Sequence, residues 1–152
     1  MINKKTNLFI FSWMMSMLVS LNVLAAQEPP LPDTFAEHKI VMQISDPNPF
    51  KQTLVLNVAG NLVKYYGSTN MDLEIVAFGP GVRLMLEGNV NTPRIKSLMA
   101  TGVRFSACEN TLTNFAKILG KKPKLIEGID VVPAGAARLI QLNEAGYKTL
   151  KP

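Results

Sequence analysis

Apolar and polar positions follow two alternating patterns along most of this chain. Continuous apolar runs typical of buried strands end at turn-forming residues, and a further short run near the C-terminus indicates a fifth strand. These runs cover residues 39–44, 73–78, 103–107, 129–132 and 147–150. Between them, apolar residues recur every three or four positions, as on one face of a helix. The expected helices cover residues 50–66, 82–86, 92–101, 109–119 and 135–145.

The alternation predicts one α/β domain with a parallel, flavodoxin-like sheet of about five strands and helices on both faces. Right-handed crossovers then place every loop from a strand to the next helix at the same edge of the sheet. These loops are residues 45–49, 79–81, 107–110 and 133–135. Ligands of open α/β sheets bind at this edge, so we expect the functional residues there.

The N-terminal residues have the pattern of an export signal. Lys4 and Lys5 precede an almost wholly apolar segment that ends in small residues around Ala25. We expect cleavage after Ala25, a Pro-rich leader over residues 26–37 and the folded domain over residues 38–152. The alternative is a retained membrane anchor, since the apolar segment is nearly long enough to span a bilayer.

Composition narrows the range of functions. The formal net charge of +5 falls to +3 when Lys4 and Lys5 leave with the signal. The remaining basic residues are scattered, apart from a small lysine cluster at 121–124 that is typical of a solvated loop, so we expect no nucleic-acid partner. After cleavage we also expect no membrane partner, and a periplasmic location.

Cys108 is the only cysteine and the leading candidate for chemistry. It lies where the third strand ends and a helix begins, and the positive end of a helix favours the reactive thiolate. The alternative is a small buried apolar residue, a common fate of free cysteine. The neighbouring carboxylate of Glu109 would oppose ionisation of the thiol unless it turns away or accepts a proton.

The residues expected around Cys108 each have a second, structural interpretation. Gly79, Pro80 and Gly81 could present backbone N–H groups to an anion, but they are also typical of a tight turn. Asn110 and Thr111 could position a substrate, but capping of the helix is favoured. Asp46 and Asn48 after the first strand have the same two interpretations.

Other classes of site are not indicated. His38, the only histidine, lies at the start of the first strand, opposite the loops, and is expected to be a surface residue. With one histidine and one cysteine, no metal cluster of recognisable spacing is present. No phosphate-binding or hydrolase motif is found, and we expect no cofactor.

Three separate motifs resemble the DsrE/DsrF-like family. They are Val76-Ala-Phe-Gly-Pro-Gly-Val82, Gly102-Val-Arg-Phe-Ser-Ala-Cys-Glu-Asn-Thr-Leu112 and Val131-Val-Pro-Ala-Gly-Ala-Ala-Arg-Leu-Ile-Gln-Leu142. The resemblance runs from about residue 38 to the C-terminus. It implies a compact parallel α/β fold and assembly as a homo-oligomer, a trimer or a hexamer.

The resemblance also implies a function. The best understood members of the family are sulfur relays, in which a cysteine carries a persulfide from a donor thiol to an acceptor thiol. Cys108 matches the cysteine that carries sulfur in several members, and the 79–81 turn with Asn110 and Thr111 would line its pocket. The expectation is a periplasmic sulfur carrier of the sulfurtransferase-like kind. The alternative is a non-catalytic, oligomeric protein that binds a small ligand and has a structural cysteine.

Overall fold

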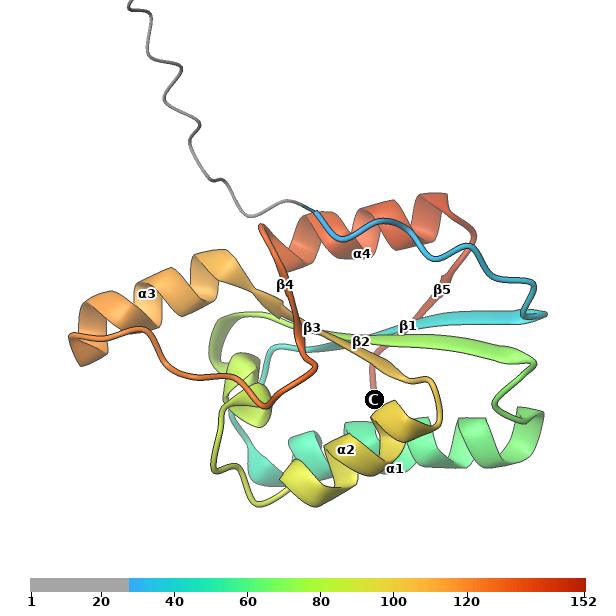
Figure 1. Ribbon diagram of the computed structural model, residues 1–152, viewed down its shortest axis with the longest axis horizontal. Helices are drawn as coiled ribbons and strands as arrows, with labels where there is room; N and C mark the ends of the chain where they lie inside the picture. The colour runs from blue at the N-terminus through green and yellow to red at the C-terminus, as the bar shows by residue number, and fades with distance from the viewer. Residues whose placement is uncertain (1–27) are drawn as a thin grey trace, which may run out of the picture.

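Residues 28–152 are described by the computed structural model and contain a five-stranded parallel sheet with helices on both faces (Figure 1). This confirms the predicted fold class. The predicted signal peptide, residues 1–25, lies outside the described residues, as do the first two residues of the leader. No helix within residues 28–152 combines the length and the apolar character that crossing a bilayer needs.

Ten elements follow one another within residues 28–152. They are β1 (His38–Ile44), α1 (Pro49–Tyr66), β2 (Met71–Ala77), η1 (Gly79–Met85), α2 (Thr92–Ala100), β3 (Arg104–Cys108), α3 (Glu109–Leu119), β4 (Asp130–Val132), α4 (Gly135–Glu144) and β5 (Lys148–Leu150). The predicted elements agree with these except around η1. There the expected turn at 79–81 is itself the first part of a 3₁₀ helix, because Pro80 has the fixed φ angle that suits a helix start.

The order of the strands explains why one helix lies apart from the others. The strands are ordered β4-β3-β2-β1-β5, so the chain moves outward from β1 to β4 and then returns across the sheet to β5. Because crossovers are right-handed, this reversal places α4 on the opposite face from α1 and α2 (Figure 1). The carboxyl ends of all strands meet at one edge, where α3 begins.

The start of α1 shows how local sequence begins a helix. The Asn48 side chain accepts a hydrogen bond from the Phe50 amide at 2.9 Å, and Pro49 occupies the first helical position. Asp46 in turn accepts from the Asn48 amide and pairs with Lys51. The favoured capping role is therefore confirmed for Asn48, whereas Asp46 holds the turn before the helix and does not cap it.

The two faces of the sheet differ in chemistry. Successive side chains of a strand point to opposite faces, so Leu73 and Ile75 of β2 enter the apolar core under α1 and α2. Asp72 and Glu74 point instead toward α4, where the apolar cluster is much smaller. The face under α4 is therefore held partly by charged groups.

Glu74 and Arg138 form the centre of this charged face. Both are almost fully buried, at 0% and 2% exposed. The guanidinium of Arg138 on α4 donates from Nε and from its second terminal nitrogen to the two oxygens of Glu74, at 2.9 and 3.0 Å. Ser106 on β3 also donates to Glu74, at 2.7 Å. The bidentate pairing of Arg138 with Glu74 fixes the position of α4 over the centre of the sheet.

Arg104 extends the cluster on the neighbouring strand. It lies beside Glu74 in the β2–β3 register and pairs with both Asp72 and Glu74. It also donates to the Tyr147 hydroxyl at 3.3 Å. Burial and the contact with Asp72 raise the pKa of Tyr147 to about 12. Two basic and two acidic side chains thus balance one another on this face.

The pairing keeps Glu74 ionised. Burial alone would raise the pKa of its carboxyl. The hydrogen bonds from Arg138 and Ser106, together with the charges of Arg138 and Arg104, outweigh burial and lower this pKa below its ordinary value of 4.5.

Replacing Glu74 by Gln should strongly destabilise the protein, because it leaves the buried guanidinium of Arg138 without its counter-charge. We expect the free energy of unfolding to fall by about 3–5 kcal/mol, measured by urea denaturation. Asp46→Asn, which breaks the solvent-exposed pair with Lys51, is the control and should change the stability little. Equal effects of the two substitutions would contradict this assignment.

The same pair predicts a pH dependence. A carboxyl whose pKa is lowered by folding stabilises the native state above its unfolded value, 4.5, and this contribution is lost as the pH falls through the folded value. The wild-type protein should therefore lose stability on acidification below pH 4.5 more steeply than Glu74→Gln. Parallel stability curves for the two proteins would contradict the prediction.

Candidate functional site

The four strand-to-helix loops meet at one edge of the sheet, as predicted. The Phe78 amide donates to the carbonyl of Ile44 at 3.2 Å, which joins the ends of β1 and β2. The Gly79 amide donates to the Thr111 hydroxyl at 2.9 Å, which joins η1 to α3. The Asn110 amide reaches the carbonyl of Pro133 at 3.4 Å, which joins α3 to the start of α4. Cys108 lies among these loops.

Cys108 is the last residue of β3 and the N-cap of α3. It shares a strand face with Arg104 and Ser106, so its side chain belongs to the face under α4. The residue is 5% exposed, and its side chain makes no capping hydrogen bond to α3. The thiol is therefore close to the start of one helix and almost covered.

The first turn of α4 is the nearest cover over Cys108. A Cβ atom added to Gly135 would lie 3.3 Å from the Cβ of Cys108 and 3.0 Å from that of Phe78. These contacts are tighter than ordinary packing, so a side chain at position 135 would require Phe78, Cys108 or the start of α4 to shift. Ala134, the N-cap of α4, also provides no side-chain hydrogen bond to the helix.

Two helix N-termini without capping side chains thus lie beside Cys108. Their first amides point along the helix axes toward the N-terminal ends, where the helix dipole is positive. An anionic group at this junction would be stabilised by both helices. The arrangement suits a thiolate or a sulfur adduct of Cys108.

Glu109 does not face the thiol with a free negative charge. Both of its carboxylate oxygens accept hydrogen bonds from the ammonium group of Lys122, at 2.7 and 2.8 Å. Thr113 also donates to it weakly, at 3.4 Å. Of the two possibilities open from the sequence, pairing with Lys122 supports a carboxylate turned away from the thiol.

The other predicted neighbours serve mainly to join the loops. The favoured capping role of Asn110 and Thr111 is wrong, because Cys108 is the N-cap and Thr111 instead accepts from Gly79. The Gly79 amide is thereby already used. A Cβ at Gly81 would lie 2.3 Å from the carbonyl oxygen of Ile44, so this glycine allows η1 to approach β1. Pro80 lies at the start of η1.

Two features near the site are not predicted by the sequence pattern. The sequence pattern places Gly135 only in a strand-to-helix loop, and it does not predict the buried charged cluster around Glu74. Asp72 and Glu74 lie two apart in an apolar strand, and Arg104 and Ser106 do so in the next. This spacing places each pair on one face and could have indicated the cluster. Arg138, on a distant helix, offered no comparable pattern.

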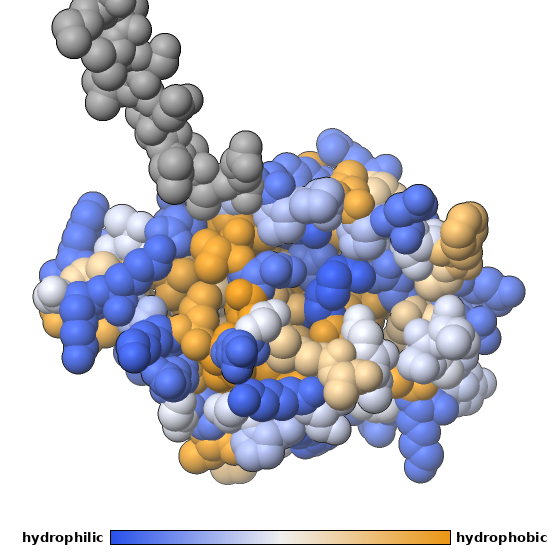
Figure 2. Space-filling model, in the orientation of Figure 1, coloured by the Kyte–Doolittle hydropathy of each residue, from blue (hydrophilic) through white to orange (hydrophobic). Residues whose placement is uncertain are grey.

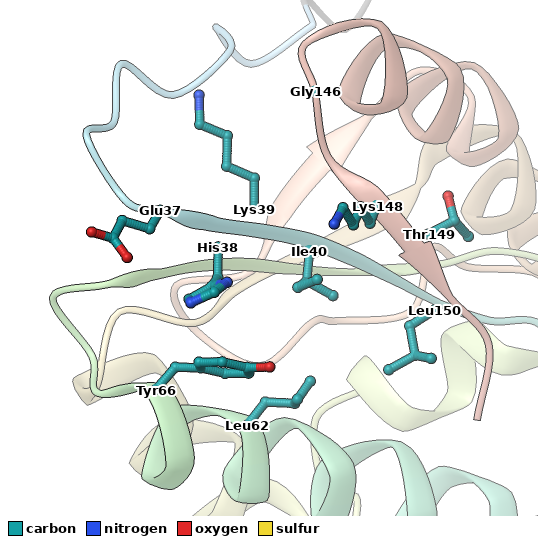
Figure 3. A pocket seen from close by; sticks show the side chains of 10 residues that line it. All are labelled: Glu37, His38, Lys39, Ile40, Leu62, Tyr66, Gly146, Lys148, Thr149 and Leu150. Carbon is teal, nitrogen blue, oxygen red and sulfur yellow. The ribbon is translucent and has the colours of Figure 1, made fainter.

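A separate cavity lies far from Cys108, at the amino end of β1. Its volume is about 390 Å³, and it opens between α1 and the β1–β5 edge (Figure 3). The side chains of His38, Tyr66, Leu62 and Leu150 point into this space. The rings of His38 and Tyr66 lie 4.0 Å apart between centroids. His38 is at the start of β1 as predicted, opposite the loops.

A metal centre is not formed by the described residues. Within residues 28–152, no three His, Cys, Asp or Glu side chains are grouped so that they could hold a metal ion.

The comparisons with known proteins point to one family. A model of the DsrE/DsrF-like family matches residues 39–152. Among solved structures, a protein of unknown function, MTH1491 from Methanobacterium thermoautotrophicum, is 27% identical, with 76% of this chain and 99% of that one covered and a TM-score of 0.67. No curated protein matches the chain.

Two further solved structures show the same fold at lower identity. YchN from E. coli is 22% identical over 76% of this chain and 99% of its own, with a TM-score of 0.60. BT1422 from Bacteroides thetaiotaomicron, described as a conserved protein of unknown function, is 20% identical over 75% and 94% of the two chains, with a TM-score of 0.55.

Gly135→Ala should push the start of α4 away from Cys108, because the added methyl group meets Phe78 and the thiol residue. We expect a loss of about 1–3 kcal/mol in the free energy of unfolding, measured by urea denaturation.

Gly60→Ala is the matched control. Gly60 lies inside α1, and an added Cβ would be 3.9 Å from the nearest side-chain atom, an ordinary contact. This substitution should stabilise the helix by about 0.5–1 kcal/mol. A Gly135→Ala variant as stable as the wild type would show that α4 does not begin tightly against Cys108.

Proposed function

Because this chain belongs to the DsrE/DsrF-like family, we propose that it is a sulfur carrier whose Cys108 holds a persulfide. The observation that carries the proposal is the junction of the uncapped N-termini of α3 and α4 at this single cysteine. Both helix ends favour negative charge, which a thiolate and a deprotonated persulfide carry.

The proposed transfer conserves atoms and electrons. The Cys108 thiolate attacks the outer sulfur of a donor persulfide, R–S–SH. A new S–S bond forms at Cys108, the S–S bond of the donor breaks, and the donor leaves as the thiolate R–S⁻. An acceptor thiolate then attacks the outer sulfur on Cys108, takes it away, and releases Cys108 as the thiolate.

The burial of Cys108 would protect its persulfide in the proposed transfer. We propose that the protein works in the periplasm, supported by the signal-like residues 1–25. In an oxidising compartment an exposed persulfide would exchange with other thiols and disulfides. A side chain that is only 5% exposed is protected from such exchange, and a donor or acceptor then needs a local opening to reach it.

We also propose that the protein works as a homo-oligomer, a trimer or a hexamer. Several large apolar side chains are exposed on the single chain, among them Ile118 and Leu119 of α3 and Phe50 of α1. Figure 2 shows apolar surface on the face that carries the edge strand β4, between α3 and the layer of α1 and α2. Contiguous apolar surface of this kind supports contacts between copies.

The sulfur-carrier proposal predicts a cysteine-dependent change of mass. After incubation with polysulfide, the intact mass of the mature wild-type protein should rise by one sulfur atom, and a thiol reductant should reverse the gain. The Cys108→Ser variant, which has no cysteine, should gain none. Equal masses for the two proteins after treatment would refute the proposal.

The second candidate function is the binding of a small ligand in the cavity of Figure 3. Its volume of about 390 Å³ is typical of small-molecule sites. The rings of His38 and Tyr66, inclined to each other by 39°, offer aromatic contacts for a planar group, Leu62 and Leu150 offer apolar walls, and Lys148 offers a positive charge. These features favour a small aromatic carboxylate.

Benzoate is a suitable probe of this cavity. A ligand that binds only the native state raises the midpoint of thermal unfolding with its concentration. Benzoate should do so for the wild type and not for Leu62→Trp, which fills the cavity. Val90→Trp, at an exposed position outside the cavity, is the control and should respond like the wild type. Identical responses of all three proteins would rule out binding in this cavity.

A further inference from the structure

The last part of the leader packs against the domain as an extended segment. Residues 28–37, which we call the N-terminal strap, form neither helix nor strand. From Leu31 to Glu37, exposed and half-buried residues alternate, with Pro32, Thr34 and Ala36 on the half-buried side. A period of two is that of an extended chain with one side against a surface. Figure 1 shows the strap on the same face of the sheet as α4.

The strap is joined to the buried charged cluster at one point. The carbonyl oxygen of Pro29 accepts a hydrogen bond at 2.9 Å from the terminal nitrogen of Arg138 that Glu74 does not use. With the strap in place, Arg138 is 2% exposed, and each of its three guanidinium nitrogens donates a hydrogen bond, two to Glu74 and one to Pro29. The strap therefore completes the hydrogen bonding of the residue that holds α4 on the sheet.

The strap is an addition to the family domain. The family match begins at residue 39, beyond the strap. MTH1491 and YchN are covered over 99% of their own length by 76% of this chain. Residues 1–38, a quarter of the chain, precede the family match. The strap therefore lies outside the part of the chain that the family model describes.

The position of Arg138 connects the strap to the cysteine site. Arg138 lies in the first turn of α4, and its amide donates to the carbonyl of Ala134. Gly135 in the same turn packs against Cys108. We propose that the strap is a removable cover: seated on Arg138, it holds the first turn of α4 over Cys108, and its release exposes the thiol. This regulation rests on the proposed sulfur-carrier function.

The seating of the strap is suited to reversible release. Glu28 Oε1 in the strap and Gln141 Oε1 on α4 are buried and have no hydrogen-bond partner among the described residues. Gln141 lies three positions after Arg138, on the same side of the helix. Buried oxygens without partners oppose the stabilisation that the Pro29–Arg138 hydrogen bond supplies. The strap is thus held by one strong contact beside two unfavourable ones.

Two chains that differ only in the anchoring residues test the proposal. One begins at Glu28 and keeps Pro29, and the other begins at Asp33 and lacks it. Iodoacetamide modifies only Cys108, since the chain has no other cysteine. The chain that begins at Asp33 should be labelled at least about fivefold faster, the lower end of common coupling between sites. Equal rates in two folded chains would overturn the proposal.

Arg138→Lys, made in both chains, tests whether Arg138 carries the coupling. Lysine keeps the positive charge opposite Glu74 but lacks the third arm of the guanidinium that reaches Pro29. Removal of the strap should then change the labelling rate little. An undiminished effect in the Arg138→Lys background would show that the strap acts elsewhere and would overturn the proposal.

Hydrogen exchange supplies a measurement that needs no substitution. The amide of Arg138, which donates to the carbonyl of Ala134 in the first turn of α4, should exchange faster in the chain that begins at Asp33, while the amides of α1 should not change. Unchanged exchange in α4 would contradict a strap that holds this turn. Alkylation and exchange do not depend on sulfur transfer. Strap-dependent labelling without a gain of sulfur would remove the sulfur-carrier function alone, and a gain of sulfur with strap-independent labelling would remove the regulation alone.

Discussion

The paired hydrogen bonds between Glu74 and Arg138 are the constraint on which the rest of the structure depends. α4 crosses the sheet from β4 to β5 over a face that has only a small apolar cluster. Without a specific contact, this helix would have few features to fix its position. The buried guanidinium of Arg138 donates hydrogen bonds to both carboxylate oxygens of Glu74 on the central strand β2. This bidentate pairing determines where the first turn of α4 lies.

That position gives Cys108 its surroundings. With α4 anchored, Gly135 lies against Cys108, and the start of α4 meets the start of α3 beside this residue. The first turn of α4 also covers the Cys108 side chain. The position of this turn therefore supplies both a helix N-terminus that would stabilise an anionic sulfur and protection from solvent. The carbonyl of Pro29 completes the donors of Arg138 and ties the N-terminal strap to the same turn. A single ion pair thus connects helix placement, the site and access to it.

Much of this arrangement was predictable from the sequence, and the limits have physical causes. Periodicity located the strands and helices, and the handedness of crossovers placed Cys108, Gly79–Gly81 and Pro133–Gly135 at one edge. Helix capping failed as a guide for Asn110 and Thr111, because a hydroxyl can serve a neighbouring loop as well as its own helix. The Glu74–Arg138 pair joins residues 64 positions apart, and no local pattern reports such a contact. Likewise, the need for glycine at 135 comes from Phe78 and Cys108, which lie on other elements.

A crystal structure of the mature protein after treatment with polysulfide tests the central claim most directly. The account predicts electron density for a second sulfur atom on Cys108, at the junction of the α3 and α4 N-termini, with Arg138 still paired with Glu74. An unmodified Cys108 beneath an α4 whose Arg138 has left Glu74 would contradict it.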